Sequence, residues 1–211
     1  NLQIIFATKN GNIRRNQLSD FTNIRQNGKI AMKLNENDEL VSVIPCSDQD
    51  NVLLATRLGK AIRFDVNDVR VFVGRGSSGV RGIKLKPNDY VVSMSLIPNL
   101  EKRYILSVTE NGFGKRTPIE DYRMTNRGGQ GVANIECSTR NGPVVASYVA
   151  SEDDQIMLVT NSGKLIRIRV HGGEGDSIRV AGRKTQGVRL FDVDDEEKVV
   201  SVALLNDSDE G

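Results

Sequence analysis

Ile4-Ile5-Phe6-Ala7-Thr8-Lys9-Asn10-Gly11 is the first of four similar stretches in this chain, and their recurrence decides the fold. The equivalent stretches begin at Val52, Ile105 and Ile156 and align with the first without gaps. Their glycines are 48, 53 and 51 residues apart, and an arginine follows each glycine by four residues. A repeat with a period of about 20 to 50 residues is typical of solenoids and propellers. The chain therefore consists of four units that share the pattern Thr-x-x-Gly-x-x-x-Arg.

Each unit continues with a second glycine, a strand-like stretch and a closing apolar run. The second glycines are Gly28, Gly79, Gly131 and Gly187, and strand-like stretches such as Ile30–Leu34 and Val80–Leu85 follow them. The closing runs are Leu40–Val43, Tyr90–Met94, Val144–Ser147 and Lys198–Val202. Short runs rich in β-branched residues, separated by pairs such as Asn10-Gly11, indicate strands joined by tight turns. We therefore predict an all-β chain with about four strands in each unit.

The repeat also predicts how the sheets are arranged. A single four-stranded sheet cannot bury both of its faces, and stacking of neighbouring sheets supplies the missing contacts. The sequence thus predicts a propeller-like domain of four four-stranded blades over residues 1–205. The blades are expected at about 1–50, 51–100, 101–152 and 153–205, with residues 206–211 outside them.

The composition excludes several classes of protein. The chain has 211 residues, of which 38% are apolar and 27% charged, and this supports a packed core. Its longest apolar runs have four residues, as at Ile4–Ala7, whereas a membrane-spanning helix needs roughly 18. Cys46, Cys137 and the lone His171 are too few and too far apart for a disulfide framework or a zinc site. We expect no metal site, no catalytic residues and a reducing, cytosolic setting.

The charge is distributed unevenly along the chain. The formal net charge is only +2, but eight acids lie between Asp192 and Gly211, opposed by Lys198 alone. Residues 1–191 carry 28 bases and 19 acids, a net charge of about +9. An excess of this size predicts a surface that binds polyanions.

The recurring arginine is the first candidate for function. The positions are Arg15, Arg63, Arg116 and Arg167, with Arg14, Lys60, Lys115 and Lys164 on the same strands. A cation at the same place in every unit predicts a charged track on the surface of the blades. The alternative is that the aliphatic stem packs on the sheet and the guanidinium pairs with a carboxylate of a neighbouring blade. Both interpretations stay open from the sequence.

A second set of cations lies in the loops around the second glycine. It consists of Arg25, Arg75, Arg127 and the pair Arg183-Lys184, with Lys29 and Arg81 just beyond the glycine. Loops that combine flexible cations with free backbone amides suit phosphate oxygens, although any one loop can instead be a polar turn with an incidental base. Six Phe, four Tyr and no Trp leave few rings for stacking single-stranded bases. We therefore predict that the two sets of cations bind duplex DNA.

Four stretches make the chain resemble the C-terminal domain of the bacterial DNA gyrase A protein: Phe6–Arg15, Gly79–Leu85, Asn111–Thr117 and Gly182–Val188. The resemblance implies a β-pinwheel, a propeller-like disc whose blades exchange strands and whose basic rim wraps duplex DNA without sequence specificity. The family usually has six blades, and the four units here are similar to the last four. Asn126–Gly131 is similar to the family's first-blade box but lacks its paired arginines and lysine. Residues 206–211 resemble the start of the family's acidic tail.

The resemblance further implies a place in a larger enzyme. The parent would be DNA gyrase, an ATP-dependent type II topoisomerase that introduces negative supercoils, with this chain as its non-catalytic accessory domain. The implied partners are double-stranded DNA, the gyrase B protein and the rest of the gyrase A protein, while ATP and Mg²⁺ would bind to other domains of the enzyme. The implied location is cytoplasmic and nucleoid-associated. Two alternatives stay open: the C-terminal domain of topoisomerase IV, and a propeller scaffold that binds proteins and whose binding depends little on salt.

Overall fold

The structure is a computed structural model that describes residues 2–24, 26–98, 103–172 and 177–205. The strands are β1 (Gln3–Thr8), β2 (Asn12–Gln17), β3 (Leu40–Cys46), β4 (Asn51–Thr56), β5 (Lys60–Asp65), β6 (Val71–Phe72), β7 (Val80–Arg81), β8 (Val91–Ile97), β9 (Tyr104–Thr109), β10 (Phe113–Pro118), β11 (Val132–Ala133), β12 (Val144–Ala150), β13 (Gln155–Thr160), β14 (Leu165–Arg169), β15 (Val188–Arg189) and β16 (Val199–Leu205). Three short 3-10 helices accompany them: η1 (Leu18–Phe21), η2 (Val66–Asp68) and η3 (Ile119–Asp121). The predicted all-β fold is confirmed.

The shared Thr-x-x-Gly pattern forms a tight hairpin turn in each unit. In the first unit the turn joins β1 to β2, and the Gly11 amide donates to the Thr8 carbonyl at 3.0 Å. The Thr8 hydroxyl accepts a hydrogen bond from the Asn12 amide at 3.2 Å, and Lys60 and Lys164 donate in the same way in their units. Gly11 has a φ of +85°, which a residue without a side chain adopts at little cost. The threonine and the glycine are therefore both required by the turn.

The first three sheets are each completed by the next unit of the sequence. The first sheet has the order β3-β1-β2-β6, with β7 also paired to β2, and β6 and β7 both come from the second unit. The next two sheets are β8-β4-β5-β11 and β12-β9-β10-β15, whose last strands again come from the following unit. The fourth sheet is β16-β13-β14. The sequence units and the sheets are therefore offset by one strand, and neighbouring units are interlocked.

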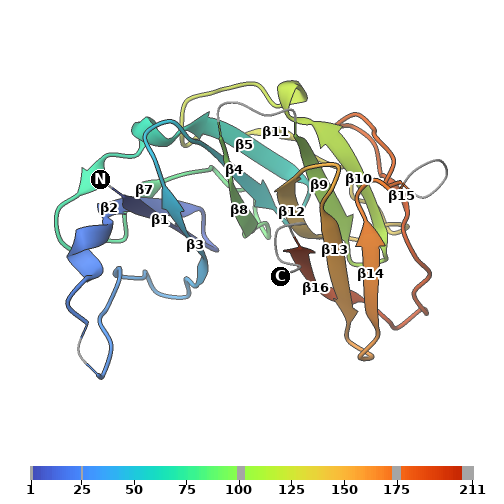
Figure 1. The fold of residues 1–211 in the computed structure, drawn as a ribbon, viewed down its shortest axis with the longest axis horizontal. Helices are drawn as coiled ribbons and strands as arrows, with labels where there is room; N and C mark the ends of the chain where they lie inside the picture. Colours follow the sequence, from blue (N-terminus) through green and yellow to red (C-terminus); the bar gives the residue numbers. More distant parts are fainter. Residues whose placement is uncertain (1, 25, 99–102, 173–176, 206–211) are drawn as a thin grey trace.

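Figure 1 shows the four sheets following one another as an arc, from the blue β1–β3 sheet at one end to the orange β13 and β14 at the other. The strands β3, β8, β12 and β16 form one edge of their sheets and contact one another in succession. The exchanged strands β6, β7, β11 and β15 lie at the opposite edge of the first three sheets. This arrangement defines an inner side and an outer perimeter.

The core lies between consecutive sheets. Ile5, Leu54 and Phe64 belong to a cluster that joins the first two sheets, and Leu106 and Ile156 belong to one that joins the last two. A smaller cluster, which includes Leu53, Ile105 and Tyr122, joins the second sheet to the third. Each fully buried aliphatic side chain contributes about 1.5–3 kcal/mol. Contacts between sheets, rather than within one sheet, therefore provide most of the apolar burial.

Two strands differ from the prediction. The expected strand over 80–85 is paired only at β7, because Gly82 and Ile83 turn to donate to the carbonyl of Gly11. The expected strand over 30–34 does not form, since no strand of the described chain pairs with it. In the part of the chain that the structure describes, no helix is long and apolar enough to cross a membrane.

Candidate nucleic-acid interface

Three segments carry the exchanged strands, and we call them the exchanged segments: residues 69–83, 122–135 and 178–191. Together they contain nine Lys and Arg residues and no Asp or Glu. The rest of the chain contains 20 bases and 27 acids. The net positive charge of the molecule is therefore concentrated on the outer perimeter, where the exchanged strands lie.

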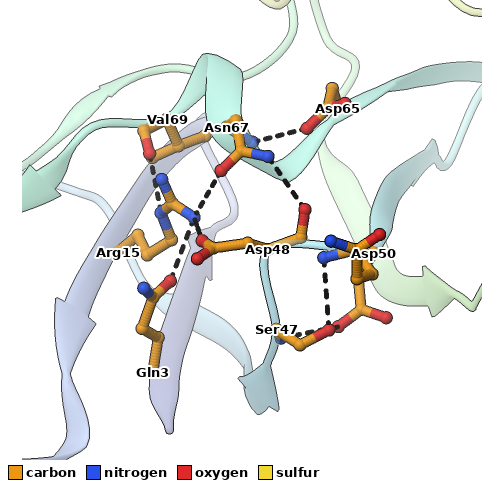
Figure 2. A network of polar contacts seen from close by, with 9 residues as sticks. Gln3, Arg15, Ser47, Asp48, Asp50, Asp65, Asn67 and Val69 are labelled. Carbon is orange, nitrogen blue, oxygen red and sulfur yellow. Dashed lines mark hydrogen bonds and ion pairs between the residues drawn. The ribbon is translucent and has the colours of Figure 1, made fainter. Parts of the chain in front are cut away.

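The recurring arginine fixes each exchanged segment to the preceding sheet. Figure 2 shows Arg15 of β2 among Gln3, Asp48, Asn67 and Val69. Its Nε donates to the Val69 carbonyl at 2.7 Å, and one terminal nitrogen donates to Gln3 at 3.0 Å and to Asp48 at 2.9 Å. Val69 begins the exchanged segment of the second unit. The guanidinium of one unit thus holds the backbone of the next.

The same contact recurs in the second and third units. Arg116 donates from Nε to the Ile178 carbonyl at 2.7 Å, and Arg63 donates to the Tyr122 carbonyl at 3.3 Å. Ile178 and Tyr122 occupy the position that Val69 occupies in its unit. At three of its four positions the recurring arginine therefore holds neighbouring units together. The prediction that Arg15, Arg63 and Arg116 contact DNA is wrong.

Arg14 and Lys115 are also buried rather than available to DNA. Arg14 donates to the carbonyls of Ser77 and Gly74, and Lys115 donates to the carbonyl of Gly182. These carbonyls lie in the exchanged loops. Burial lowers the pKa of Lys115 to about 8. The predicted contacts with DNA are corrected here too, because Arg14, Arg15, Lys115 and Arg116 are all at most 6% exposed.

The other members of the first set occupy varied positions. Lys60 is half-buried on β5, and Lys164 is exposed but pairs with Glu197 at 2.7 Å. Arg167 is exposed on β14, where its Nε donates to Gln155 at 2.6 Å. Gln155 occupies the position of Gln3, so this arginine keeps the local part of the contact that Arg15 makes.

The loop arginines of the second set link successive loops along the perimeter. Arg127 donates to the Arg81 carbonyl at 2.7 Å, Arg183 donates to the Ala133 carbonyl at 3.0 Å, and Arg75 donates to the Ile30 carbonyl. The three acceptors are equivalent residues, two positions after the second glycine of the preceding unit. Arg75, Arg127 and Arg183 are half-buried, whereas Arg81 and Lys184 are exposed. Lys29 donates to the Asp20 carbonyl at 2.8 Å, and Arg25 lies outside the described residues.

Sequence reasoning missed a third set of equivalent cations: Arg70, Arg123 and Arg179. All three are exposed, and each directly follows the residue whose carbonyl is held by the recurring arginine of the preceding unit. The recurring arginine of one unit thereby positions the exposed arginine of the next. An apolar-Arg-apolar triplet, eight or nine residues before the second glycine, is the sequence signal that identifies this set.

The exchanged segments are suited to phosphate groups rather than to bases. They combine exposed guanidinium and ammonium groups with glycine-rich loops, and no carboxylate competes within them. None of the four tyrosines is exposed, so no tyrosine ring is offered to a base for stacking. Among the described residues, no group of three or more His, Cys, Asp or Glu side chains can hold a metal ion. The interface is therefore electrostatic.

Comparisons with known proteins agree with this architecture. The sequence model of a family described as the DNA gyrase C-terminal domain, a beta-propeller, matches residues 3–47, 50–98, 103–142 and 154–206. The DNA gyrase A protein of Rickettsia felis is 42% identical to this chain over 256 residues, which cover 100% of the chain and 28% of that protein.

Solved structures of two C-terminal domains have a similar fold. The C-terminal domain of DNA topoisomerase IV has a TM-score of 0.89 at 27% identity, over 98% of this chain and 62% of that one. The C-terminal domain of DNA gyrase A has a TM-score of 0.84 at 30% identity, over 97% of this chain and 66% of that one.

Proposed function

This chain belongs to the DNA gyrase C-terminal domain family, and we propose that it binds duplex DNA along its exchanged segments and bends the duplex around the arc of sheets. The observation that carries the proposal is the separation of charge: nine bases and no acid in the exchanged segments, against an acidic remainder. Binding without sequence specificity follows, because the cations meet phosphates, which carry no sequence information.

Counterion release supplies the binding energy in this proposal. If about six of the perimeter cations each neutralise a phosphate, the logarithm of the affinity falls with the logarithm of the salt concentration with a slope of roughly −5. Smooth bending of a short DNA site costs on the order of 1–6 kcal/mol, and contacts with successive units offset this cost. The interlocked units give the perimeter the rigidity that bending a stiff duplex requires.

Within the parent protein we place the chain as the accessory domain of a type II topoisomerase. A duplex wrapped on the perimeter is presented to the cleavage domains of the larger enzyme, and the handedness of the wrap sets the sign of supercoiling. The full activity belongs to gyrase, with ATP and Mg²⁺ bound elsewhere, with the gyrase B protein and the rest of the gyrase A protein as partners, and with a nucleoid-associated, cytoplasmic location. This chain contributes DNA binding and no catalytic residue.

Topoisomerase IV is the second candidate for the parent enzyme, favoured by the close superposition with its C-terminal domain. The sequence identity favours gyrase, because relatives that match the whole chain at 40–42% identity are gyrase proteins. A chimaera that carries this chain on a gyrase core distinguishes the two. Negative supercoiling supports gyrase, and relaxation alone supports topoisomerase IV.

Ligation of nicked plasmid in the presence of the chain tests wrapping directly. After the protein is removed, the linking number of the closed circles is expected to differ from that of a protein-free control, by an amount that rises with protein added. The variant Arg70→Gln/Arg123→Gln/Arg179→Gln is expected to lose this shift. Tight binding without a change in linking number contradicts wrapping, and absence of binding contradicts the proposed function as a whole.

A further inference from the structure

The third exchanged segment, residues 178–191, contains a cavity on the outer perimeter. The cavity has a volume of about 360 Å³ and is lined by residues 179–182 and by Thr185, Gly187 and Val188. Arg179, Gly182 and Thr185 are exposed, so the cavity is open to solvent. Ligand sites in proteins are clefts of about 300–1,000 Å³, and this cavity is at the small end of that range. It therefore has room for one small ligand.

The first exchanged segment, residues 69–83, has a different side chain at the equivalent position. Phe72 pairs with Asn16 of β2, and the Asn16 side-chain amide donates to the Phe72 carbonyl at 3.1 Å. In the third exchanged segment, the Thr117 hydroxyl of β10 donates to the Ala181 carbonyl at 2.7 Å. Asn16 and Thr117 each directly follow the recurring arginine of their unit. Ala181 therefore occupies the position of Phe72.

The ring of Phe72 is buried against two guanidinium groups. The guanidinium carbon of Arg70 lies 3.9 Å from the ring centre and that of Arg14 lies 5.1 Å from it, and Phe72 is only 5% exposed. Ala181 has only a methyl group at this position, and Arg179, the equivalent of Arg70, lines the cavity. The cavity therefore corresponds to the space of an aromatic ring that the fourth unit does not supply.

The charge around the cavity selects an anionic ligand. Residues 178–191 contain four basic residues and no Asp or Glu: Arg179, Arg183, Lys184 and Arg189. A guanidinium group stacks on the face of an aromatic ring, nucleobases included, and Lys and Arg side chains bind phosphate oxygens. Val180, which is 43% exposed, adds an apolar contact at the same place. A ligand that joins an aromatic ring to a phosphate matches both features.

We propose that this cavity binds one nucleotide, whose nucleobase stacks on Arg179 in the space beside Ala181 and whose phosphate meets the cations of the same segment. The nucleotide is either a free mononucleotide or an unpaired nucleotide of DNA that lies on the perimeter. Only the second source rests on the proposed function. The bases of a fully paired duplex stay within the helix, so this site is separate from the phosphate contacts of paired DNA.

Calorimetric titration with three small probes tests the chemistry of the site without DNA. Adenosine monophosphate carries a nucleobase and a phosphate, adenosine carries only the nucleobase, and ribose 5-phosphate carries only the phosphate. If the free nucleotide is the ligand, saturable binding of adenosine monophosphate is expected, with a loss of affinity for each of the other two probes. Equal affinity for ribose 5-phosphate or for adenosine overturns the proposal, because the site then does not recognise both parts of a nucleotide.

Filling the cavity tests its position. Ala181→Phe is expected to abolish nucleotide binding without lowering the melting temperature, since Phe72 shows that this position accepts a ring. Thr125→Phe is the matched control, because Thr125 occupies the same position in the third unit, and it is expected to retain binding. Arg179→Met removes the stacking guanidinium at an exposed position and is expected to weaken binding. Full binding by Ala181→Phe, or equal loss in the control, overturns the proposal.

A duplex with a single unpaired 2-aminopurine distinguishes the two sources of the nucleotide. A change in its fluorescence on binding, which Ala181→Phe abolishes, identifies DNA as the source. Binding of adenosine monophosphate without this change identifies the free nucleotide. If neither the monophosphate nor the unpaired base gives a signal that Ala181→Phe removes, the proposal is overturned. Affinity for a fully paired duplex is measured separately, and Ala181→Phe is expected to leave it unchanged, so failure of this site and failure of the proposed function are distinguished.

Discussion

Replacing Arg15 by alanine is expected to unfold the chain at lower temperature rather than to remove a DNA contact. The side chain is 4% exposed and gives two buried hydrogen bonds, to the Val69 carbonyl and to Gln3. Hydrogen bonds to charged groups contribute about 1.5–3 kcal/mol each, so losing these two costs about 3–6 kcal/mol. The ion pair to Asp48 adds at most about 1 kcal/mol, because that carboxylate is 62% exposed.

The expected result is a large decrease in the melting temperature. For a chain of this size each kcal/mol lowers the midpoint by about 2–4 °C, so the decrease is on the order of 6–24 °C. Circular dichroism measures the midpoint, and fluorescence anisotropy with a labelled duplex, at a temperature where both proteins are folded, measures affinity. Arg70→Ala is the matched control, because Arg70 is exposed and follows the residue that Arg15 holds.

The control is expected to show the opposite pattern. Arg70 stacks on Phe72 with its guanidinium carbon 3.9 Å from the ring centre, which contributes about 0.5–1 kcal/mol at an exposed site. Arg70→Ala should therefore leave the midpoint within a few degrees of the unaltered chain while DNA affinity falls. If Arg15→Ala instead preserved the midpoint and lost affinity, the guanidinium would be acting on DNA and the assignment of this arginine would be refuted.

Two further predictions concern pH. Burial, reinforced by Arg183, lowers the pKa of Lys115 to about 8, so between this value and the ordinary lysine pKa of 10.5 the folded chain binds fewer protons than the unfolded chain. The free energy of unfolding should rise with pH across that window, and urea unfolding of Lys115→Met should show a smaller rise; an unchanged slope would contradict the assignment. The pKa of Glu197 is lowered to about 2, chiefly by hydrogen bonds from Lys164 and Ser162, so the stability that it contributes is present above the ordinary pKa of 4.5 and is lost as pH falls towards 2. Glu197→Gln should therefore be less stable at pH 7 and lose less stability on acidification, which acid titration of both proteins would measure, whereas parallel acid curves would count against it.

The fold was largely predictable because its determinants are local. The Thr-x-x-Gly pattern specifies a hairpin turn through contacts within five residues, and its recurrence predicts the number of units. The family resemblance rests on the same stretches and on the loop around Gly187. What the turns do not specify is which sheet a later strand joins, and this is why the expected strand at 30–34 was wrong and the exchanged strands are short.

The site was only partly predictable, because exchange brings groups together that are far apart in sequence. Arg15 and Val69 are 54 residues apart, and nothing near either residue predicts that one accepts a hydrogen bond from the other. The alternation of side chains along a strand does indicate that the two neighbouring arginines cannot share one face. Arg14 and Arg15 are consecutive and point to opposite faces of β2. Both are buried because the exchanged segment covers them: Arg14 donates to the carbonyls of Gly74 and Ser77, and Arg15 donates to that of Val69. Lys184 lies in a loop and is exposed, as loop residues usually are, whereas Arg81 is exposed although it belongs to β7.

The central claim is that duplex DNA follows the exchanged segments, and the salt dependence of binding measures it most directly. Affinity for a duplex of random sequence is measured over a series of salt concentrations for the unaltered chain, for Arg70→Gln/Arg123→Gln/Arg179→Gln, and for Lys9→Gln/Arg57→Gln/Lys198→Gln. The second triple variant removes the same charge from a pocket on the inner side of the arc, which is lined by residues of β3, β8, β12 and β16. We predict that the first variant lowers the log-log slope by about 2.7, since each lost phosphate contact removes about 0.9, and that the second changes it little. Equal effects of the two variants, or a larger effect of the second, would contradict the claim.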